Sequence, residues 1–217
     1  MESFTTPVNV LVEGITDEAV ARRLLDHVGL RCGTVYGKEG KAALVQRLPN
    51  YNQAARFAPW LVVVDLDRDA DCAPPFVDRV LPHPTGHMFL RVAVRAVEAW
   101  LLADVERIAA FLGVRAALIP RNPDAEDDPK AALVNLARRS RWRTIREDMV
   151  PREGSGGRVG PVYAGRLIEF VAAGERSWRP DVAARHSDSL RRCVEALRTL
   201  RESTFHSSPG INKIVER

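Results

Sequence analysis

Along the first part of the chain, apolar positions follow two patterns in turn: continuous apolar runs, typical of buried strands, and a spacing of four residues, typical of one helix face. Val8–Glu13 is a short β-branched, apolar run that ends in an acid, which is typical of a buried strand. Across Val20–Val28 the apolar residues fall four apart, as expected for one face of a helix. We expect Asp17 to cap this helix and Gly29 to end it.

The same alternation continues toward residue 100. A weak strand is expected at Thr34–Tyr36, followed by a helix over Lys41–Leu48 that Pro49 should stop. Trp60–Asp65 is a continuous apolar run suited to the centre of a parallel sheet. Met88–Val94 predicts another strand, which runs into a helix. Strands that alternate with helices predict an α/β fold with a mostly parallel, Rossmann-like sheet and helices on both faces.

The second half of the chain is predicted to be helical. Asp104 is expected to cap a helix that ends at Gly113, and Asp128 with Pro129 should open another. Residues 151–161 are rich in glycine and indicate a loop. A last helix carries an apolar stripe made of Leu190, Val194, Leu197 and Leu200.

Length and composition restrict the class of protein. The chain has 217 residues, of which 46% are hydrophobic, so it can bury a core and is not disordered. We expect an α/β core over residues 1–103 and, packed on it, a helical extension with an arginine-rich loop over 104–217. No apolar run approaches the roughly 20 residues of a membrane helix. The scattered thiols of Cys32, Cys72 and Cys193 are typical of a reducing compartment, so we expect a cytoplasmic protein.

Positive charge is concentrated in one segment. The formal net charge is +4, and residues 138–158 hold seven arginines against three acids. Such a segment can track a phosphate backbone, and we name Arg138, Arg139, Arg141 and Arg143 as candidate nucleic-acid contacts. A solvated loop, or a surface that docks an acidic protein, is an equally good interpretation.

Two groups of acids follow predicted strands. Glu13 ends the first strand, and Asp17 lies four residues later across a turn at Gly14. Asp65 ends the strongest strand, and Asp67 should project to the same side if the extended backbone persists for two more residues. Parallel sheets place their sites at the carboxyl ends of strands, so these acids are expected to meet in one crevice.

Gathered carboxylates need a compensating charge. Two like charges a few ångströms apart repel by roughly 4 kcal/mol near a protein surface. Hard oxygen ligands of this kind select Mg²⁺ (or Mn²⁺), and two such ions would stabilise the attacking and leaving oxygens of a phosphodiester displacement. The candidate ligands from these groups are Glu13, Asp17, Asp65, Asp67 and Asp69. The alternatives are that Asp17 is only a helix cap and that Asp69 is a solvated loop acid.

These motifs resemble those of the Toprim domain, which topoisomerases, bacterial primases and overcoming-lysogenization-defect nucleases share. Glu13-Gly14 and Asp65-x-Asp67 match its two motifs in the right order, and Glu13-x-x-x-Asp17 is similar to the two-metal variant in those nucleases. Arg91–Asp104 (RVAVRAVEAWLLAD) resembles a small stand-alone Toprim-like family of unknown function. The segments 37–48 and 163–200 are also similar to that family, so the resemblance covers most of the chain.

The resemblance implies roles for single residues. Glu13 would be a metal ligand or general acid/base, and Asp17, Asp65 and Asp67 would be metal ligands. Glu98 stands where the small family has a recurrent glutamate, so it is a further candidate ligand; an arginine-paired structural role is the alternative. The nucleases also use a lysine near the scissile phosphate, for which Lys38, Lys41 and Lys130 are the candidates; we place Lys38 and Lys41 among the candidate nucleic-acid contacts.

The resemblance therefore implies a Mg²⁺-dependent nuclease that hydrolyses phosphodiester bonds, with DNA as the expected substrate. Such small Toprim proteins often accompany an ATPase in an anti-phage defence module. This sequence has no Gly-x-x-x-x-Gly-Lys-Ser/Thr loop, so an ATP-dependent step would come from a partner. A non-catalytic adaptor or regulatory subunit and a ribonuclease are the alternatives, and a homo-oligomer is possible in each.

Two other motifs are weaker. His83 and His87 flank Pro84 and Gly86, which forbid the helical geometry of a zinc site, and no second cysteine pair accompanies Cys72. Asp-x-Asp also occurs in haloacid-dehalogenase phosphatases, whose first aspartate is a nucleophile. The later motifs of that family are not found in this sequence.

Overall fold

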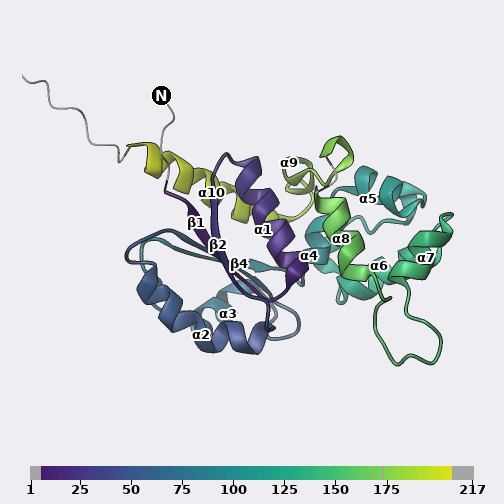
Figure 1. Ribbon diagram of the computed structural model, residues 1–217, viewed down its shortest axis with the longest axis horizontal. Helices are drawn as coiled ribbons and strands as arrows, with labels where there is room; N and C mark the ends of the chain where they lie inside the picture. Colours follow the sequence, from purple (N-terminus) through teal and green to yellow (C-terminus); the bar gives the residue numbers. More distant parts are fainter. Residues whose placement is uncertain (1–5, 173, 207–217) are drawn as a thin grey trace, which may run out of the picture.

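The computed structural model describes residues 6–172 and 174–206, and its centre is a four-stranded, all-parallel sheet (Figure 1). The strand order is β2-β1-β3-β4. The strands are β1 (Val8–Val12), β2 (Cys32–Gly37), β3 (Trp60–Asp65) and β4 (Met88–Ala93). The predicted α/β class and parallel sheet are confirmed, and each predicted strand is present within two residues of its expected ends.

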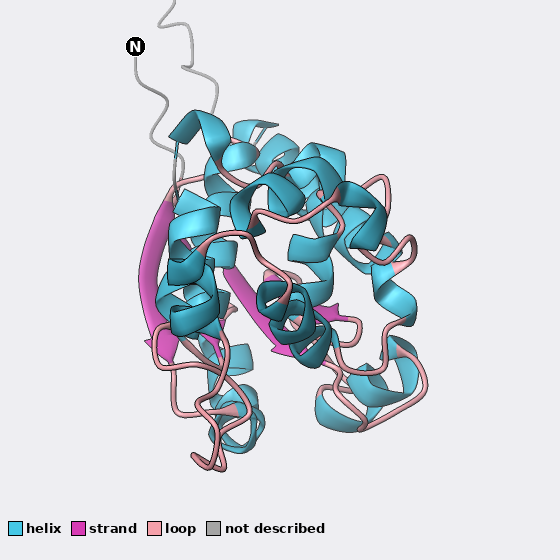
Figure 2. Ribbon diagram, turned by 90° about the vertical axis from the view of Figure 1, so that its right-hand side faces the viewer, coloured by secondary structure: helices cyan, strands magenta, loops and turns pink. Residues whose placement is uncertain are grey.

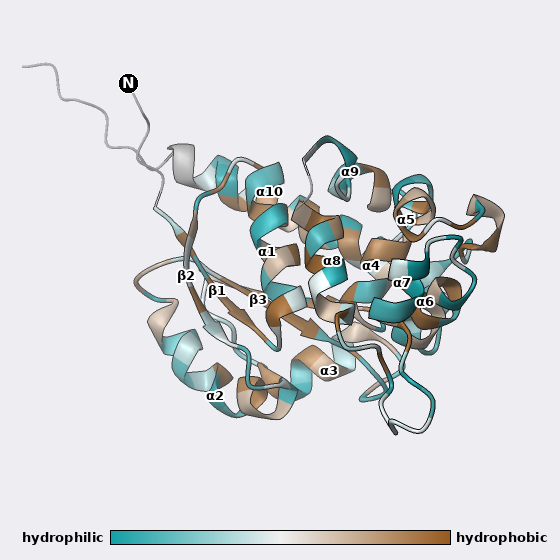
Figure 3. Cartoon of the chain, turned by 45° about the vertical axis from the view of Figure 1, so that its right-hand side comes forward, coloured by the Kyte–Doolittle hydropathy of each residue, from teal (hydrophilic) through white to brown (hydrophobic). Residues whose placement is uncertain are grey.

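The two central strands are the most apolar. In β3 every residue from Trp60 to Val64 is buried, because a central strand meets helices on both faces. Figure 3 shows β1 and β3 in brown, between helices whose exposed faces are teal. The continuous apolar run in the sequence therefore predicted the strand with the greatest burial.

Helices cover both faces of the sheet (Figures 1 and 2). On one face lie α1 (Ile15–His27) and α10 (Asp188–His206), and their apolar sides join one large core cluster. On the other face, α2 (Lys41–Ala54) and α3 (Ala73–Val80) close a second, smaller cluster. The sheet thus separates two cores, as in other three-layer α/β proteins.

The remaining helices gather beyond the carboxyl end of the sheet, at the right of Figure 1. They are α4 (Val97–Leu102), α5 (Val105–Leu112), α6 (Pro129–Arg138), α7 (Arg143–Met149), α8 (Tyr163–Ala172) and α9 (Pro180–Ala183). The Trp178 indole donates to the Trp100 carbonyl (3.1 Å), and the Trp100 indole donates to Ser189 Oγ (2.7 Å). The large core cluster contains side chains from before and after residue 103. The predicted extension packs on the core, although its last residues, 207–217, lie outside the described part.

Helix caps follow the sequence in this half. The Asp104 side chain accepts from Arg107 N (3.4 Å) at the start of α5, and Gly113 ends that helix with φ of 66°. The Asp128 side chain accepts from Ala131 N (2.9 Å) at the start of α6. The predicted start of each helix and the end of α5 are therefore confirmed.

Two helix predictions need correction. Pro49 does not stop α2, which continues to Ala54. The ring removes one backbone hydrogen bond, but Leu44, Leu48 and Asn52 form a buried face that continues past it. Helix α3 had no counterpart among the expected elements. Its two prolines occupy its first turn, where their missing N–H groups are not needed.

No helix among the described residues is long and apolar enough to cross a membrane.

Candidate active site

The carboxyl ends of β1 and β3 bring two of the expected acids together. Glu13 directly follows β1, and Asp65 is the last residue of β3, the strand beside it. The backbone N–H of Asp65 donates to Glu13 Oε1 at 2.8 Å. The two acids therefore lie side by side at the carboxyl edge of the sheet.

Asp17 joins them, but not as a helix cap. Helix α1 begins at Ile15 with Gly14 as its N-cap, so Asp17 lies inside the first turn and the predicted capping role is wrong. Its side chain lies over Gly14: a Cβ on Gly14 would come 3.2 Å from Asp17 Oδ2. Asp17 is 8% exposed, although an aspartate in a first turn is usually solvated. This burial places it with the other acids.

Glu98 is the fourth acid, and Asp65 helps to place it. Asp65 Oδ1 accepts from Val97 N (2.9 Å), which joins the end of β3 to the start of α4. Glu98, the next residue, is 3% exposed. Its Oε1 accepts from the Tyr163 hydroxyl (3.3 Å), and Oε2 is buried with no hydrogen-bond partner among the described residues. The alternative role for Glu98, pairing with an arginine, is not observed among the described residues; its partners are a tyrosine and a lysine.

That lysine is Lys130, in the first turn of α6. Its Nζ lies 3.6 Å from Glu98 Oε1, and the charge of Glu98, with those of Asp65 and Asp17, raises the pKa of Lys130. Burial and the Glu98 charge raise the pKa of the Tyr163 hydroxyl, so it remains a donor. Of the three candidate lysines, Lys130 is the one paired with the buried Glu98, whereas the charge of Lys41 acts on Glu13 from the rim.

Asp67 and Asp69 lie at the rim. After Asp65 the chain leaves the extended conformation, and Asp67 takes a positive φ of 49°, so the expectation that Asp67 projects beside Asp65 is wrong. Its side chain is 57% exposed. Lys41 Nζ binds Asp67 Oδ2 (3.1 Å), Asp69 Oδ2 (2.6 Å) and the carbonyl of Leu66 (3.1 Å). Lys41 therefore compensates the rim acids.

We call Glu13, Asp17, Asp65 and Glu98 the inner acids of the site. Burial and mutual repulsion raise the pKa values of the first three. Burial raises the pKa of Glu13 to about 7, against the hydrogen bond from Asp65, and the Asp17 charge adds to the rise. Burial and the Glu98 charge raise the pKa of Asp17 to about 6. Burial and the charges of Asp17, Glu98 and Glu13 hold the pKa of Asp65 well above its ordinary range. Without a further cation, this cluster binds protons near neutral pH.

The donor set suits a hard divalent cation. Carboxylate oxygens are the preferred ligands of Mg²⁺ and Mn²⁺, and Glu98 Oε2 is a buried acceptor with no partner among the described residues. As the side chains stand, no group of three or more His, Cys, Asp or Glu residues in the described ranges is arranged to hold a metal ion. The chemistry of Glu13, Asp17, Asp65 and Glu98 fits such an ion, and the side chains would have to draw closer to bind it.

A pocket of about 500 Å³ opens beside the cluster. Its lining carries four cationic and four acidic side chains, which are Arg68, Arg95, Lys130 and Arg158 and Asp67, Asp69, Asp127 and Asp128. Arg158, from the glycine-rich loop, pairs with Asp128, the cap of α6. Arg95 and Arg158 in this pocket, and Tyr163 at Glu98, lie 30 or more residues from Glu13 and Asp65 along the chain, so no local sequence pattern predicted them at the site.

The other candidate nucleic-acid contacts lie apart from this pocket. Lys38 pairs with Glu18 (2.9 Å), and Arg143 pairs with Glu147 (2.7 Å). Arg139 and Arg141 line a different pocket, of about 500 Å³, together with Arg115. The Arg141 guanidinium lies 4.4 Å from the centre of the Trp142 ring.

Arg138, Arg139 and Arg141 have no acidic partner among the described residues. Their positive charges can therefore contact a phosphate, whereas those of Arg143 and Arg158 are paired with acids.

Comparisons with protein-family models, with curated proteins and with solved structures found no match to this chain.

Proposed function

We propose that this protein is a Toprim-type, divalent-metal-dependent nuclease that hydrolyses phosphodiester bonds in DNA. One observation carries the proposal: Glu13, Asp17, Asp65 and Glu98, from four different elements, are gathered at the carboxyl end of a parallel sheet. Two of these acids, Asp17 and Glu98, are buried, and Glu13 and Asp65 are partly buried beside them. Gathering four mutually repelling carboxylates away from water destabilises a fold, and such arrangements are found where chemistry requires them. The order of the motifs along the chain supports the Toprim assignment.

Glu13, Asp17, Asp65 and Glu98 are the residues that would hold Mg²⁺ or Mn²⁺. A bound ion would neutralise charge that develops on the phosphoryl oxygens during hydrolysis. Asp67 and Asp69 contribute from the rim, by setting the position of Lys41. This assignment keeps Glu13, Asp17, Asp65 and Glu98 from the expected ligands and drops Asp67 and Asp69.

Two residues have the properties that proton transfer and phosphate binding need. Glu13 uses Oε1 to accept from Asp65, and its pKa of about 7 suits a general base that takes a proton from water at neutral pH. Lys130 has a single, long ion pair and lies at the wall of the pocket, so it can donate to a phosphate oxygen. Lys41, with three short contacts, is held in place and is the weaker candidate.

Nucleic acid as the substrate is supported by charge. Arg138, Arg139 and Arg141 have no acidic partner among the described residues and offer phosphate contacts. The pocket beside the acids adds four cationic side chains, against four acidic ones in the same lining. Backbone contacts of this kind distinguish poorly between DNA and RNA, so a ribonuclease is the nearest variant of the proposal. An ATPase partner and a role in anti-phage defence are proposed from the family resemblance alone.

A second candidate function is a non-catalytic adaptor or regulatory subunit. It is favoured by the placement of Lys130, which gives the buried acids a cation from the chain itself. The absence of a three-acid ligand set among the described residues is in line with it. This candidate predicts a stable, folded protein with no turnover.

The test is a cleavage assay with purified protein on supercoiled plasmid, single-stranded DNA and RNA, in Mg²⁺, Mn²⁺ or EDTA. We expect metal-dependent cutting of DNA that the Asp65→Ala variant loses by at least 100-fold. Asp26→Ala is the matched control, because it removes an exposed carboxylate whose ion pair is within its own helix. Folding of both variants is checked by thermal unfolding. Cutting by Asp65→Ala at the wild-type rate contradicts the proposal, and no cutting by any protein favours the adaptor.

A further inference from the structure

A pocket of about 500 Å³ lies between the carboxyl ends of α5 and α6, and its charged side chains are all arginines. Arg115 follows α5, Arg139 is the C-cap residue of α6, and Arg141 comes two residues later. No acid lines this pocket, and none of the three arginines pairs with an acid among the described residues. This arginine pocket is therefore a local excess of positive charge.

The helix ends account for part of this placement. The carbonyl groups at the end of a helix carry a partial negative charge of about half a unit, and α5 and α6 both end at the pocket. Two helix ends compensate about one of the three guanidinium charges, so roughly two positive charges remain. That surplus suits a polyanion such as the phosphate backbone of a nucleic-acid strand.

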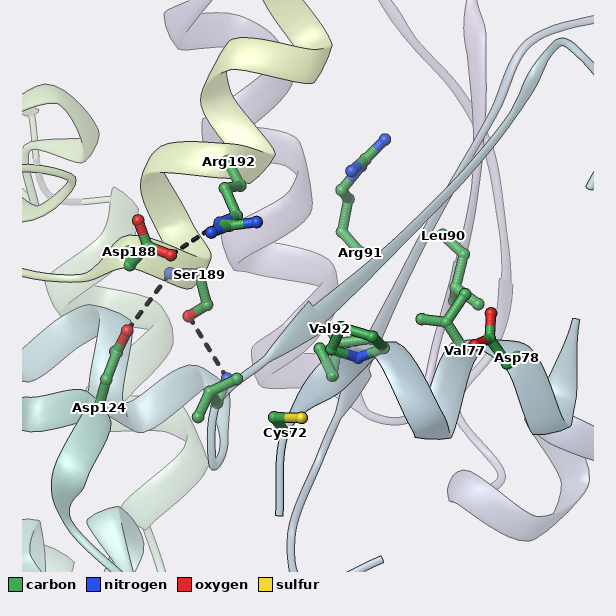
Figure 4. Close-up of a pocket in the computed structure, with 13 residues that line it drawn as sticks. Cys72, Val77, Asp78, Leu90, Arg91, Val92, Asp124, Asp188, Ser189 and Arg192 are labelled. Carbon is green, nitrogen blue, oxygen red and sulfur yellow. Dashed lines mark hydrogen bonds and ion pairs between the residues drawn. The ribbon is translucent and has the colours of Figure 1, made fainter. Parts of the chain in front are cut away.

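The groove along β4, of about 650 Å³, differs in its charges (Figure 4). Its lining holds three acids and two arginines, and Arg192 pairs with Asp188 at 2.7 Å. A second acid of the lining, Asp124, accepts from the backbone N–H of Ser189 (3.3 Å). The charges of this groove have partners within the chain, so the arginine pocket is the better site for a polyanion.

An exposed aromatic ring lies beside the arginine pocket. Of the four tryptophans, all of which the structure describes, Trp142 alone is exposed, with 45% of its surface open to solvent. The Arg141 guanidinium lies 4.4 Å from the centre of its ring. A Cβ on Gly113, in the pocket lining, would come 2.3 Å from the indole Nε1, so the ring packs on that backbone. An exposed, positioned aromatic ring beside unpaired arginines is typical of surfaces that bind single-stranded nucleic acid.

Helix α6 joins the arginine pocket to the candidate active site. Lys130, in its first turn, lies 3.6 Å from Glu98 Oε1, and Arg139 caps its other end. The helix has ten residues, so its two ends are about 15 Å apart at a rise of 1.5 Å per residue. A short length of one strand therefore reaches from the inner acids to the arginine pocket.

We propose that Arg115, Arg139, Arg141 and Trp142 bind a single strand of the DNA substrate, with phosphates on the arginines and a base stacked on Trp142. The inference rests on the proposed function for its choice of DNA. Bases in a duplex stack on one another, whereas bases of a single strand are free to stack on a side chain. The arginines thus contact either form of DNA, and Trp142 selects the single strand.

The test is equilibrium binding in EDTA, which prevents metal-dependent cutting. The probes are a fluorescein-labelled DNA strand of about 16 nucleotides, within the site sizes of known single-strand binders, and its duplex, both followed by anisotropy. We expect Trp142→Ala to weaken single-strand binding about 10-fold and duplex binding less than about 2-fold, while Trp142→Phe keeps a stacking ring and binds within about 3-fold of wild type. Equal losses with both probes, or no loss with either, overturn the proposal.

Salt dependence tests the arginines. Arg115→Ala, Arg139→Ala and Arg141→Ala should each reduce the slope of log K against log salt by about 0.7, as expected for one phosphate contact of a single strand. The matched controls are Arg56→Ala and Phe57→Ala, an exposed arginine and an exposed aromatic residue directly after α2, which lies away from α6 in Figure 1. Unchanged slopes in all three variants limit the arginines to the helix ends and overturn the proposal.

Tryptophan emission gives a readout from the wild-type protein itself. Stacking of a base should quench the emission of Trp142, and Trp142→Phe should bind the single strand without that quenching. Binding without quenching of the wild type overturns the stacking contact, and no binding of either probe leaves an acidic protein as the occupant. Cleavage in Mg²⁺ is scored separately: selective strand binding without cutting contradicts only the nuclease, whereas cutting without an effect of Trp142→Ala contradicts only this inference.

Discussion

Asp65 and Asp67 are separated by one residue and have the same side chain, yet they occupy opposite environments. Asp65 is buried among Glu13, Asp17 and Glu98, and its carboxylate accepts from the start of α4. Asp67 is 57% exposed and is paired with Lys41. The difference arises at one bond rotation, because the positive φ of Asp67 turns the chain out of the sheet.

The comparison separates two uses of acids at one sheet edge. The rim acids, Asp67 and Asp69, are paired with Lys41, and these ion pairs stabilise the loop after β3. The inner acids share the charge of Lys130, which has one long ion pair, and the pKa values of Glu13, Asp17 and Asp65 rise instead. A cluster that costs stability and has a buried unpartnered oxygen is suited to bind something; a compensated cluster is suited to hold a loop in place.

The largest expected effect is on the pH dependence of stability. The pKa of Glu13 is about 7 in the folded protein and near 4.5 in the unfolded chain, and that of Asp17 is about 6 against 3.8. The folded state therefore binds more protons between these values, and the free energy of unfolding must fall as pH rises from about 4 to 7. At about 1.4 kcal/mol for each pKa unit, the two rises together correspond to a loss on the order of 6 kcal/mol.

Urea denaturation without divalent ions, at several pH values, measures this loss. The Glu13→Gln variant removes one of the titrating groups and should flatten the curve. The Asp67→Asn variant should keep the wild-type slope. A stability that is constant or rises over this range would show that the inner acids do not repel one another as their placement implies.

The next effect is a gain in stability on neutralising one inner acid. At pH 8, Asp17→Asn should raise the free energy of unfolding by about 1–2 kcal/mol, because it removes one buried charge from a repelling group. Asp67→Asn should change it by less than about 0.5 kcal/mol, as expected for an exposed ion pair. The comparison is made by denaturant unfolding at the same pH. Destabilisation by Asp17→Asn would assign Asp17 to holding the first turn of α1.

The smallest effect is that of a divalent ion. Millimolar Mn²⁺ or Mg²⁺ at pH 8 should stabilise the protein by about 1 kcal/mol, as expected for a ligand several-fold above its Kd. The effect should be weaker at pH 5, because protons then compete for the same carboxylates. Thermal unfolding checks it, with Asp65→Ala expected to lose the response and Asp69→Ala to keep it. A response that Asp69→Ala loses and Asp65→Ala keeps would move the ion to the rim.

The sequence was informative where one residue's neighbours along the chain decide its structure. The apolar run at Trp60–Asp65 predicted a central strand, and Asp104, Gly113 and Asp128 marked helix ends, because strand burial and capping depend on a few adjacent residues. The Pro49 prediction failed because a buried helix face outweighed the loss of one hydrogen bond. The prediction that Asp17 caps α1 was wrong because Gly14 is the N-cap residue of that helix.

The sequence by itself determined the α/β class, the position of Glu13 and Asp65 at strand ends and the concentration of arginine after residue 138. These follow from local periodicity and from the rule that parallel strands end at a common edge. Only the tertiary structure decided that Glu98 lies among the inner acids while Asp67 lies at the rim, and that Lys130 and Tyr163 meet Glu98 there. Those contacts join residues 32 to 65 positions apart, and packing of α4, α6 and α8 against the sheet fixes them, so no spacing in the chain encodes them.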